Sequence, residues 1–456
     1  MNPPAEGFGW LQIVRLGLVQ ASLGAVVVLT TSTLNRVMVV ELALPALLPG
    51  LLVALHYAVQ VVRPRLGHGA DVGGRSTPWI VGGMLALALG GVGAALATAW
   101  MGSNRIGGIA AAVVAFALIG IGVGAAGTSL LVLMAKRVDA SRRAAAATIV
   151  WMMMIVGFIV TAASAGALLD PYSPARLVAV TAGVALAAFV LTLVAMHRLE
   201  GAAGSLATAV TAGAPKPAFR VALAEVWAER AARQFTIFVF IAMLAYSAQD
   251  LILEPFAGSV FGFTPGASTQ LSAVQHSGVL LGMVVVALAG SGWLGQQLRS
   301  LRVWTIGGCI ASALALLGLT LGGLVGPGWP LKPNVFLLGA ANGAFSIAAI
   351  ASMMRLAGEG RGAREGVRMG LWGAAQATAF GLGGVLGTAA SDVAHWLIVH
   401  PGTAYAAVFG LEALLFLASA RLAAGIGCGP STAASRAAQP ARGLSYGAAL
   451  EPRRSP

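Results

Sequence analysis

Runs of about twenty apolar residues recur along the whole chain, and they constrain its fold more than any other feature. A helix needs roughly 20 residues to cross the ~30 Å hydrocarbon core of a bilayer. Inside that core the backbone must satisfy its own hydrogen bonds, so the runs are expected to be helices. Only 9% of the 456 residues are charged, against roughly a quarter in soluble domains. The sequence therefore predicts an all-α membrane protein with about twelve spans, near residues 16–40, 42–62, 78–101, 106–135, 144–169, 175–197, 234–255, 269–291, 303–325, 333–354, 369–391 and 403–423.

Basic residues are distributed unevenly between alternate loops. All of the 28 lysines and arginines lie near the termini or in every second loop, except Arg36, Arg105, Arg176 and Lys332. Loops rich in Lys and Arg face the cytoplasm. We therefore expect both termini in the cytoplasm and a bacterial inner-membrane location. The net charge of +13 is explained by topology, and nucleic-acid binding is not expected.

The two halves of the chain repeat each other in places. Residues 79–83 (WIVGG) open the third predicted span, and residues 304–308 (WTIGG) open the ninth. Two six-span halves related by parallel repetition are the arrangement of major facilitator transporters. This predicts an N-terminal six-helix bundle over 1–200, a cytoplasmic linker over 201–232 with a short amphipathic helix at 219–230, a C-terminal bundle over 233–425 and a disordered cytoplasmic tail over 426–456.

The loop between the second and third predicted spans carries glycines together with one acid and one base. The spacing of Gly67, Asp71, Gly74 and Arg75 resembles the signature loop of major facilitator proteins. Glycine permits a tight turn, and Asp71 can accept from helix N-terminal N–H groups or pair with Arg75. We interpret the four residues as a gate loop. The alternative is a solvated turn whose arginine sets topology. In the second half Gln296 stands where the acid would lie, so that half is expected to lack the charged contact of the gate loop.

Polar side chains within the predicted spans form the candidate cavity and gate, because such groups are costly in a membrane and usually functional. The candidates are Asn35, Arg36, Glu41, Gln249, Asp250, Glu254, Gln376 and Glu412. Arg36 and Asp250 occupy related positions at the non-cytoplasmic mouth and have opposite charges. They are predicted to close the mouth by an ion pair, with Glu41 or Glu254 as further members. Ordinary interfacial charge is the alternative for the acids near that surface. Glu412 lies deep in the last span. Either it is protonated and stabilises the helix packing through a hydrogen bond, or it contacts a substrate.

His56 and His276 are the two histidines within predicted spans. A neutral imidazole can be a hydrogen-bonding core residue, which is the commoner case, or it can ligate the metal of a tetrapyrrole. At 1.5 Å of rise per residue, His56 lies ~10 Å below the cytoplasmic face and His276 lies at a similar depth below the other face. The two are therefore not expected to share one site.

Sequence signatures of enzymes and ATPases are missing. The chain has no P-loop, nucleophile elbow, zinc-protease helix or kinase signature, and its two cysteines have no metal-binding spacing. Gly122, Gly124 and Gly127 match a dinucleotide fingerprint but follow no strand, so they predict close helix packing. From this we expect no enzymatic activity, no ATP-driven transport and no bound metal.

Four strings resemble the PucC/LhaA family, the bacteriochlorophyll-delivery branch of the major facilitator superfamily. They are residues 33–42 (TLNRVMVVEL), 169–173 (LDPYS), 249–255 (QDLILEP) and 370–376 (GLWGAAQ). The resemblance covers roughly residues 10–425. It implies bacteriochlorophyll as cargo in an intracytoplasmic photosynthetic membrane. It also implies light-harvesting or reaction-centre apoproteins, and possible pigment-synthesis enzymes, as partners beside the membrane lipid. It makes His56 or His276 a candidate pigment ligand, with Gln376 as another donor.

Two functions remain open at this point. The first is a pigment-handling factor for the assembly of light-harvesting or other photosynthetic complexes. The second is a secondary transporter of a small solute. A cavity lined by apolar, Gly and Met residues favours the first, whereas a buried charge relay would favour the second, with Glu412 as its candidate.

Overall fold

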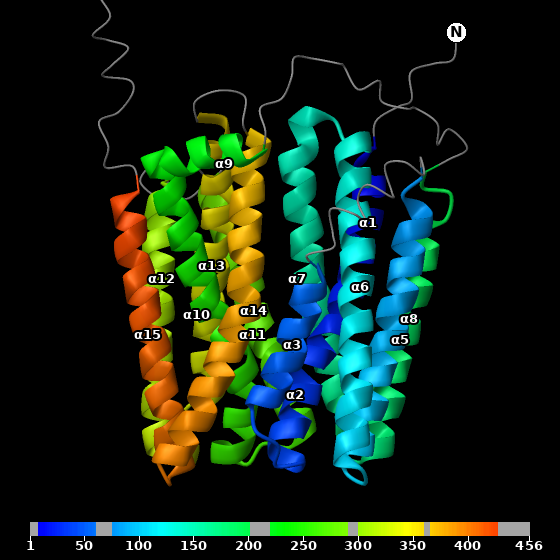
Figure 1. The fold of residues 1–456 in the computed structure, drawn as a ribbon, viewed down its shortest axis with the longest axis vertical. Coiled ribbons are helices and arrows are strands. Elements are labelled where there is room, and N and C mark those ends of the chain that lie inside the picture. Colours follow the sequence, from blue (N-terminus) through cyan, green and yellow to red (C-terminus); the bar gives the residue numbers. More distant parts are fainter. Residues whose placement is uncertain (1–7, 61–74, 201–218, 291–299, 360–364, 427–456) are drawn as a thin grey trace, which may run out of the picture.

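The computed structural model describes residues 8–60, 75–200, 219–290, 300–359 and 365–426. Its regular structure in these ranges is helical, and the long helices run nearly parallel to one axis (Figure 1). The first half contains α1 (Trp10–Val28), η1 (Leu29–Thr33), α2 (Leu34–Arg36), η2 (Val37–Glu41), α3 (Leu47–Val59), α5 (Thr77–Met101), α6 (Arg105–Arg137), η4 (Ala140–Arg142), α7 (Arg143–Leu169) and α8 (Pro174–Met196). The second half contains α9 (Phe219–Ala228), α10 (Arg230–Phe261), α11 (Pro265–Gly290), α12 (Leu301–Val325), η6 (Gly326–Gly328), α13 (Leu331–Glu359), α14 (Glu365–Leu397) and α15 (Pro401–Gly425).

Ten of the described helical segments are long and apolar enough to cross a membrane. The all-α membrane class is confirmed. The number of spans, twelve, stays a prediction, because α3 has 13 described residues and α14 falls outside the ten despite its 33 residues. The short helix expected at 219–230 is confirmed as α9.

The described chain begins and ends at the same end of the bundle, which we call the terminal end (Figure 1). The connections at 42–46, 102–104, 170–173, 262–264, 326–330 and 398–400 lie at the other end, which we call the distal end. An even number of crossings follows from this arrangement.

Small residues allow the helices to approach closely, as the sequence predicts. A Cβ atom on Gly122 of α6 would lie 2.5 Å from the backbone nitrogen of Leu87 in α5. A Cβ atom on Gly383 of α14 would lie 2.5 Å from the carbonyl oxygen of Leu244 in α10. Both gaps are too short for a side chain, so the glycines serve helix packing.

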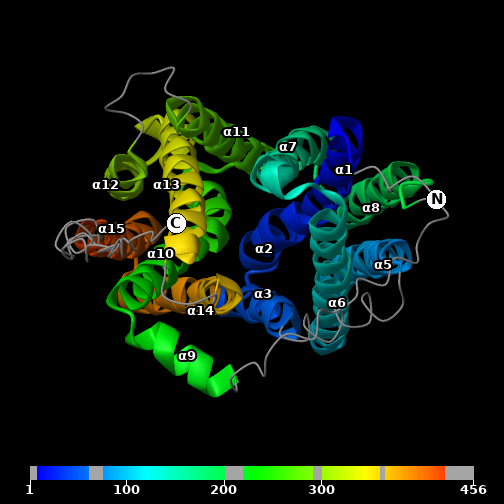
Figure 2. The same ribbon diagram turned by 90° about the horizontal axis from the view of Figure 1, so that it is seen from above.

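The two halves form two bundles that meet along a shared face, seen from above in Figure 2. At this face α7 packs against α11, and α3 packs against α14. The segment η1–α2–η2 of the first half contacts α10 of the second half. This shared face brings together most of the polar residues that the sequence singles out.

Candidate functional site between the two bundles

The first span changes helix type twice before it reaches the distal end. In η1 the N–H of Leu34 bonds to the carbonyl of Leu29, and in η2 the N–H of Leu42 bonds to that of Val37. These five-residue steps define π-helical turns, which are rare and frequent at functional sites. They lie on either side of α2. The polar residues of this segment therefore do not follow the spacing of 3.6 residues per turn of an ordinary α-helix.

Glu254 on α10 connects both bundles through one carboxyl oxygen. Its Oε1 accepts hydrogen bonds from the hydroxyls of Ser32 in η1 and Ser272 in α11. The Ser272 hydroxyl also lies 3.3 Å from that of Ser32. Glu254 is 1% exposed, and its Oε2 has no hydrogen-bond partner among the described residues. Glu254 is therefore a buried inter-bundle contact and not an ordinary interfacial charge.

The hydrogen bonds between the two bundles, which we call the seam, include two more along the first span. The Asn35 side chain donates to the carbonyl of Leu251 at 2.7 Å. The hydroxyls of Thr33 and Thr269 lie 2.9 Å apart. Together with the Glu254 contacts, they attach η1 and α2 to α10 and α11.

Arg36 pairs with Glu41, which the prediction included as a further member, and among the ion pairs of the described residues there is none between Arg36 and Asp250, so that part of the prediction is wrong. Its guanidinium lies 2.7 Å from Oε1 of Glu41 and donates to the carbonyl of Phe263, also at 2.7 Å. In an α-helix, residues five apart do not face each other, but the π turn η2 brings Glu41 above Arg36. Arg36 is 3% exposed and still reaches the second bundle through Phe263.

Two aspartates at the distal end form hydrogen bonds between the two bundles, one at each side of the shared face. Asp392 of α14 accepts the N–H groups of Ala46 and Leu47 at the start of α3, each at 2.8 Å. Asp170, after α7, accepts from the Thr264 hydroxyl at 2.8 Å. A carboxylate at a helix N-terminus is favoured by the free N–H groups and the helix dipole. The polar contacts between the bundles thus gather toward the distal end.

Three other candidate side chains lie on α10, α14 and α15 of the second bundle. Gln249 is 0% exposed and Glu412 is 2% exposed. Neither the Gln249 amide nor the Glu412 carboxyl has a partner in hydrogen-bonding geometry among the described residues. Gln376 approaches the sulfur of Met243 at 4.0 Å. The structure does not supply the hydrogen bond that a structural role for Glu412 requires.

Asp250 accepts a hydrogen bond from Gln275 of α11 at 3.3 Å, within the second bundle. Buried carboxyls without full sets of donors are costly in an apolar bundle. Asp250, Glu254 and Glu412 are therefore candidates for proton binding or ligand contact.

An array of aromatic rings crosses the shared face. Tyr57 of α3 stacks on Phe380 of α14 with centroids 5.6 Å apart, and Tyr246 of α10 meets Phe380 at 5.9 Å. His56 lies edge-on to Tyr57 at 4.8 Å. Tyr57, Tyr246 and Phe380 are only half-buried, so part of each ring surface stays accessible between the bundles.

The two histidines differ in which ring nitrogen is engaged. The Gln60 amide donates to Nε2 of His56 at 3.0 Å, because an amide nitrogen cannot accept. Nδ1 of His276 lies 2.8 Å from the Ser272 carbonyl, and a carbonyl can only accept. Neutral His276 therefore carries its proton on Nδ1 and its lone pair on Nε2. As predicted, the two histidines belong to different environments, with His276 set against Phe158 of α7 at 4.8 Å.

The gate-loop prediction lies mostly outside the described residues. Gly67, Asp71 and Gly74 fall in the range 61–74, and Gln296 falls in the range 291–299. Arg75 is described and exposed. The gate-loop interpretation stays a prediction.

Sequence reasoning missed Ser32, Ser272, Asp392 and Asp170, which all contribute to the distal contacts. Serines are common in helices and often bond to their own backbone, so no pattern marks these two. The aspartates lie at helix ends next to predicted loops, where acidic residues usually face water.

The fold defined by these bundles is that of major facilitator transporters. A bacterial homologue of the human peptide transporters PepT1 and PepT2 superposes with a TM-score of 0.66 at 15% identity, covering 91% of this chain and 97% of that one. The nucleoside transporter NupG superposes at 0.63 and 14% identity, covering 92% and 100%. At this identity the likeness concerns the fold alone.

The chain belongs to the PUCC protein family, whose model matches residues 33–428. It is 52% identical over 418 residues to the bacteriochlorophyll synthase 44.5 kDa chain of Rhodobacter capsulatus, covering 92% of this chain and 96% of that protein. It is 30% identical to protein PucC of the same species, covering 89% and 90%. The family resemblance seen in the sequence is confirmed.

The relative at 52% identity corrects one expectation. Its name assigns it to a synthase, which is an enzyme, so the exclusion of enzymatic function from missing sequence motifs is contradicted. The missing motifs belong to hydrolases, kinases and nucleotide-binding proteins.

Proposed function

We propose that this protein handles bacteriochlorophyll within a photosynthetic membrane and serves the assembly of light-harvesting or other photosynthetic complexes. The observation that carries the proposal is the 52% identity, along nearly the whole chain, to a protein named for bacteriochlorophyll synthesis. Relatives at about 30% identity carry the name PucC. The sequence expectation of cytoplasmic termini and an inner-membrane location is part of this proposal.

The shared face between the bundles supports a flat, apolar cargo. Half-buried aromatic rings from α3, α10 and α14 face one another there, and aromatic rings favour offset stacking with other flat rings. On the α7–α11 side, Ile155, Met152 and Met283 form an apolar cluster. Methionine adapts its shape to irregular partners.

His276 is the residue best suited to hold the pigment's magnesium. Its Nε2 lone pair is fixed by the Nδ1 bond to the Ser272 carbonyl, the arrangement typical of metal-ligating histidines. His56 is less suited, because Gln60 already donates to its Nε2. When bound, the pigment would bring the magnesium ion, and His276 would hold that ion through Nε2.

A secondary transporter for a small solute is the second candidate. The buried carboxyls of Glu254 and Glu412 and the half-buried carboxyl of Asp250 favour it, because such groups mark ion and proton pathways in membrane proteins. The transporter fold agrees with it.

The test is purification from a phototrophic host in mild detergent. We expect bacteriochlorophyll absorption at a fixed ratio to protein, and photosynthetic apoproteins among the co-purifying partners identified by mass spectrometry. The control is a membrane protein of similar size from the same cells. Equal pigment on both proteins, without such partners, would reject the proposal.

A further inference from the structure

Four polar side chains lie at one level inside the C-terminal bundle. They are Gln249 of α10, Ser312 of α12, Asn342 of α13 and Glu412 of α15, which we call the polar layer. Each lies about a dozen residues from the distal end of its helix, or roughly 18 Å at 1.5 Å per residue. All four are at most 2% exposed. The four helices pack beside one another (Figure 2), so each contributes one buried polar group at the same depth.

An aromatic cluster covers the polar layer toward the terminal end. Phe345 of α13 contacts Phe416 of α15 and Tyr246 of α10, with ring centroids 5.7 Å and 6.4 Å apart. Phe345 comes three residues after Asn342, and Phe416 comes four residues after Glu412. Residues three or four apart share one face of a helix. Asn342 and Glu412 therefore lie on the faces that α13 and α15 turn toward each other and toward α10.

A second aromatic contact covers the polar layer toward the distal end. Phe256 of α10 meets Phe409 of α15 with centroids 5.0 Å apart, and both rings are 0% exposed. Phe409 comes three residues before Glu412, and Phe256 comes two helical turns after Gln249. The polar groups are thus enclosed between two sets of aromatic contacts, which keep lipid and bulk water away from them.

Most hydrogen-bonding atoms of the polar layer have no partner in hydrogen-bonding geometry among the described residues. The Ser312 hydroxyl donates to Oδ1 of Asn342 at 2.8 Å. Nδ2 of Asn342, both amide atoms of Gln249 and both carboxyl oxygens of Glu412 are without a partner in that part of the chain. Buried polar groups nearly always bond to protein, to ordered water or to an ion. Several such atoms at one level indicate a site for a small polar ligand.

The acid of the layer decides which ligand fits. A buried ionised carboxyl without a counter-charge is very costly. Among the described residues of α10, α12, α13 and α15, none that is buried is basic. A protonated Glu412 would need an acceptor for its O–H, and the described residues place none in reach. A small cation neutralises the carboxylate, and carboxyl, amide and hydroxyl oxygens are the ligands that hard cations prefer.

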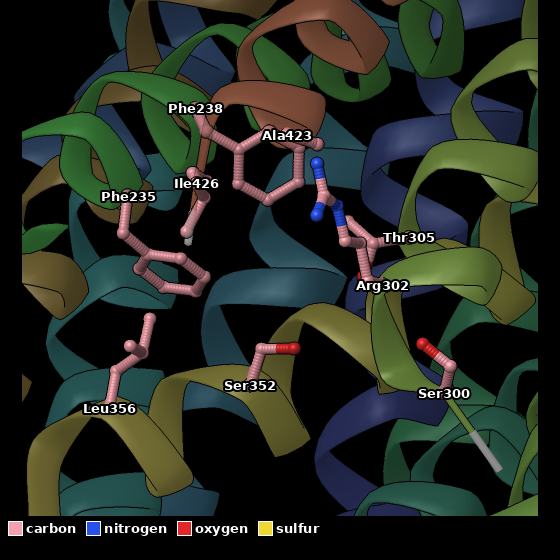
Figure 3. A pocket seen from close by; sticks show the side chains of 9 residues that line it. All are labelled: Phe235, Phe238, Ser300, Arg302, Thr305, Ser352, Leu356, Ala423 and Ile426. Atoms are coloured by element: carbon pink, nitrogen blue, oxygen red, sulfur yellow. The ribbon is translucent and has the colours of Figure 1, made fainter. Parts of the chain in front are cut away.

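The polar layer is separate from the other sites of the molecule. A cavity of about 280 Å³ lies in the same bundle at its terminal end (Figure 3). Phe235 and Phe238, in the first turns of α10, line it, and the described lining includes none of the four layer residues. His276, the candidate pigment ligand, lies on α11, which contributes nothing to the layer.

We propose that the polar layer binds one small monovalent cation, with sodium as the probe. The Glu412 carboxylate supplies the charge, and oxygens of Gln249, Asn342 and Ser312 complete the coordination. The ion links α10, α12, α13 and α15 at mid-depth and stabilises the C-terminal bundle. This role does not depend on the cargo that the protein carries.

The experiment is the binding of radiolabelled sodium to the full-length protein purified in detergent, with choline as the background cation. We expect saturable binding of one ion per chain. The unfolding temperature should rise with the logarithm of the sodium concentration, because the ion binds the folded protein. Glu412→Gln keeps the size of the side chain and removes its charge, so it should abolish both effects. Gln249→Leu should weaken sodium binding about tenfold, the usual effect of losing one polar contact with a charged group.

Glu254→Gln is the matched control. Glu254 is also buried in the second bundle, at 1% exposure, but it lies outside the polar layer and already accepts from Ser32 and Ser272. We expect this variant to bind sodium like the wild type. The comparison separates loss of the site from a general effect of removing a buried acid.

Three outcomes would overturn the proposal. Absence of saturable sodium binding to the wild type would mean that water and a protonated Glu412 occupy the layer. Wild-type sodium affinity in Glu412→Gln would place the ion elsewhere, and equal loss in Glu254→Gln would show an unspecific effect. If Glu412→Gln does not yield monodisperse protein, Gln249→Leu and Asn342→Leu decide the question, since wild-type affinity in both would reject the site.

Discussion

The hydroxyl of Ser32 in the first span donates to the carboxyl group of Glu254, 222 residues later in α10. The same carboxyl oxygen accepts from Ser272 in α11. One buried acid thus connects three helices and both halves of the protein, and it does so toward the distal end. Separation of the bundles at that end must break this contact.

We predict a measurable coupling between Ser32 and Glu254. Ser32→Ala, Glu254→Gln and the double variant form a thermodynamic cycle, read from thermal unfolding in detergent. A buried hydrogen bond contributes about 1 kcal/mol, and a donor or acceptor left without its partner costs more. We expect a coupling energy of about 1 kcal/mol or greater.

The control for this cycle is Ser419→Ala combined with Glu254→Gln. Ser419 is also buried, but its hydroxyl donates to Leu415 within α15. Additive effects are expected for this pair, because distant sites act independently. Additivity for Ser32 and Glu254 as well would show that the inter-bundle hydrogen bond contributes nothing.

A second prediction concerns the ion pair of Arg36 and Glu41. Arg36→Glu alone should impair the protein, because a new acid faces Glu41 and the contact with Phe263 is lost. Glu41→Arg in the same chain should restore part of the loss, whereas Asp250→Arg should not. The measurement is the yield of pigment–protein complexes at matched protein level.

Rescue by Asp250→Arg but not by Glu41→Arg would contradict this pairing. Because Glu41 is 34% exposed, the pair is partly solvated, and its contribution to stability should stay near the ~0–1 kcal/mol of surface pairs. The larger functional effect would come from Arg36, which is buried and reaches both bundles.

The sequence predicted the membrane class and the two-bundle fold correctly because hydrophobic runs and internal repeats follow simple physical rules. The cavity and gate roles of the polar residues within the spans stay predictions. The sequence placed Asp250 before Glu41 as the partner of Arg36 because helical patterns assume 3.6 residues per turn. The π turn η2 adds a residue per turn and puts Glu41 beside Arg36. Nothing in the string VMVVE distinguishes a π turn from an α turn.

The contacts of Ser32 and Asp392 were unpredictable for a different reason. Both depend on which helices of the two halves become neighbours, which no local pattern contains. The seam can therefore be identified only from the three-dimensional structure, in which α3 packs beside α14 and η1 packs beside α10 and α11.

A third prediction concerns Glu200, which follows α8 and caps the start of α5. Its carboxylate accepts the N–H groups of Ser76 at 2.6 Å and Thr77 at 2.9 Å, and the Thr77 hydroxyl at 2.5 Å. Burial raises the pKa of Glu200, but these hydrogen bonds outweigh it and lower the pKa below its ordinary value of 4.5. The stabilisation is therefore complete above about pH 4.5 and is lost as the pH falls through the lowered folded value.

Glu200→Ala should cost about 0.5–2 kcal/mol near neutral pH, the usual effect of losing a helix cap. Glu200→Gln keeps an acceptor but cannot ionise, so its deficit relative to the wild type should shrink as the pH is lowered from about 7 to 3. Thermal unfolding in detergent across this range is the measurement. A deficit that does not change with pH would show that ionisation of Glu200 is irrelevant to stability.

The last prediction separates His276 from His56 as pigment ligand and rests on the proposed function. The Ser272 carbonyl fixes the Nδ1 proton of His276, so its Nε2 can donate to magnesium, whereas Nε2 of His56 already accepts from Gln60. His276→Leu should therefore reduce the ratio of bacteriochlorophyll to purified protein several-fold, while His56→Leu should leave most of it. The amount of each variant in the membrane, measured by immunoblot, should match the wild type. Loss of pigment from His56→Leu alone would assign the ligand to the other histidine. Wild-type ratios in both variants would mean that the rings of Tyr57, Tyr246 and Phe380 hold the pigment without a histidine ligand.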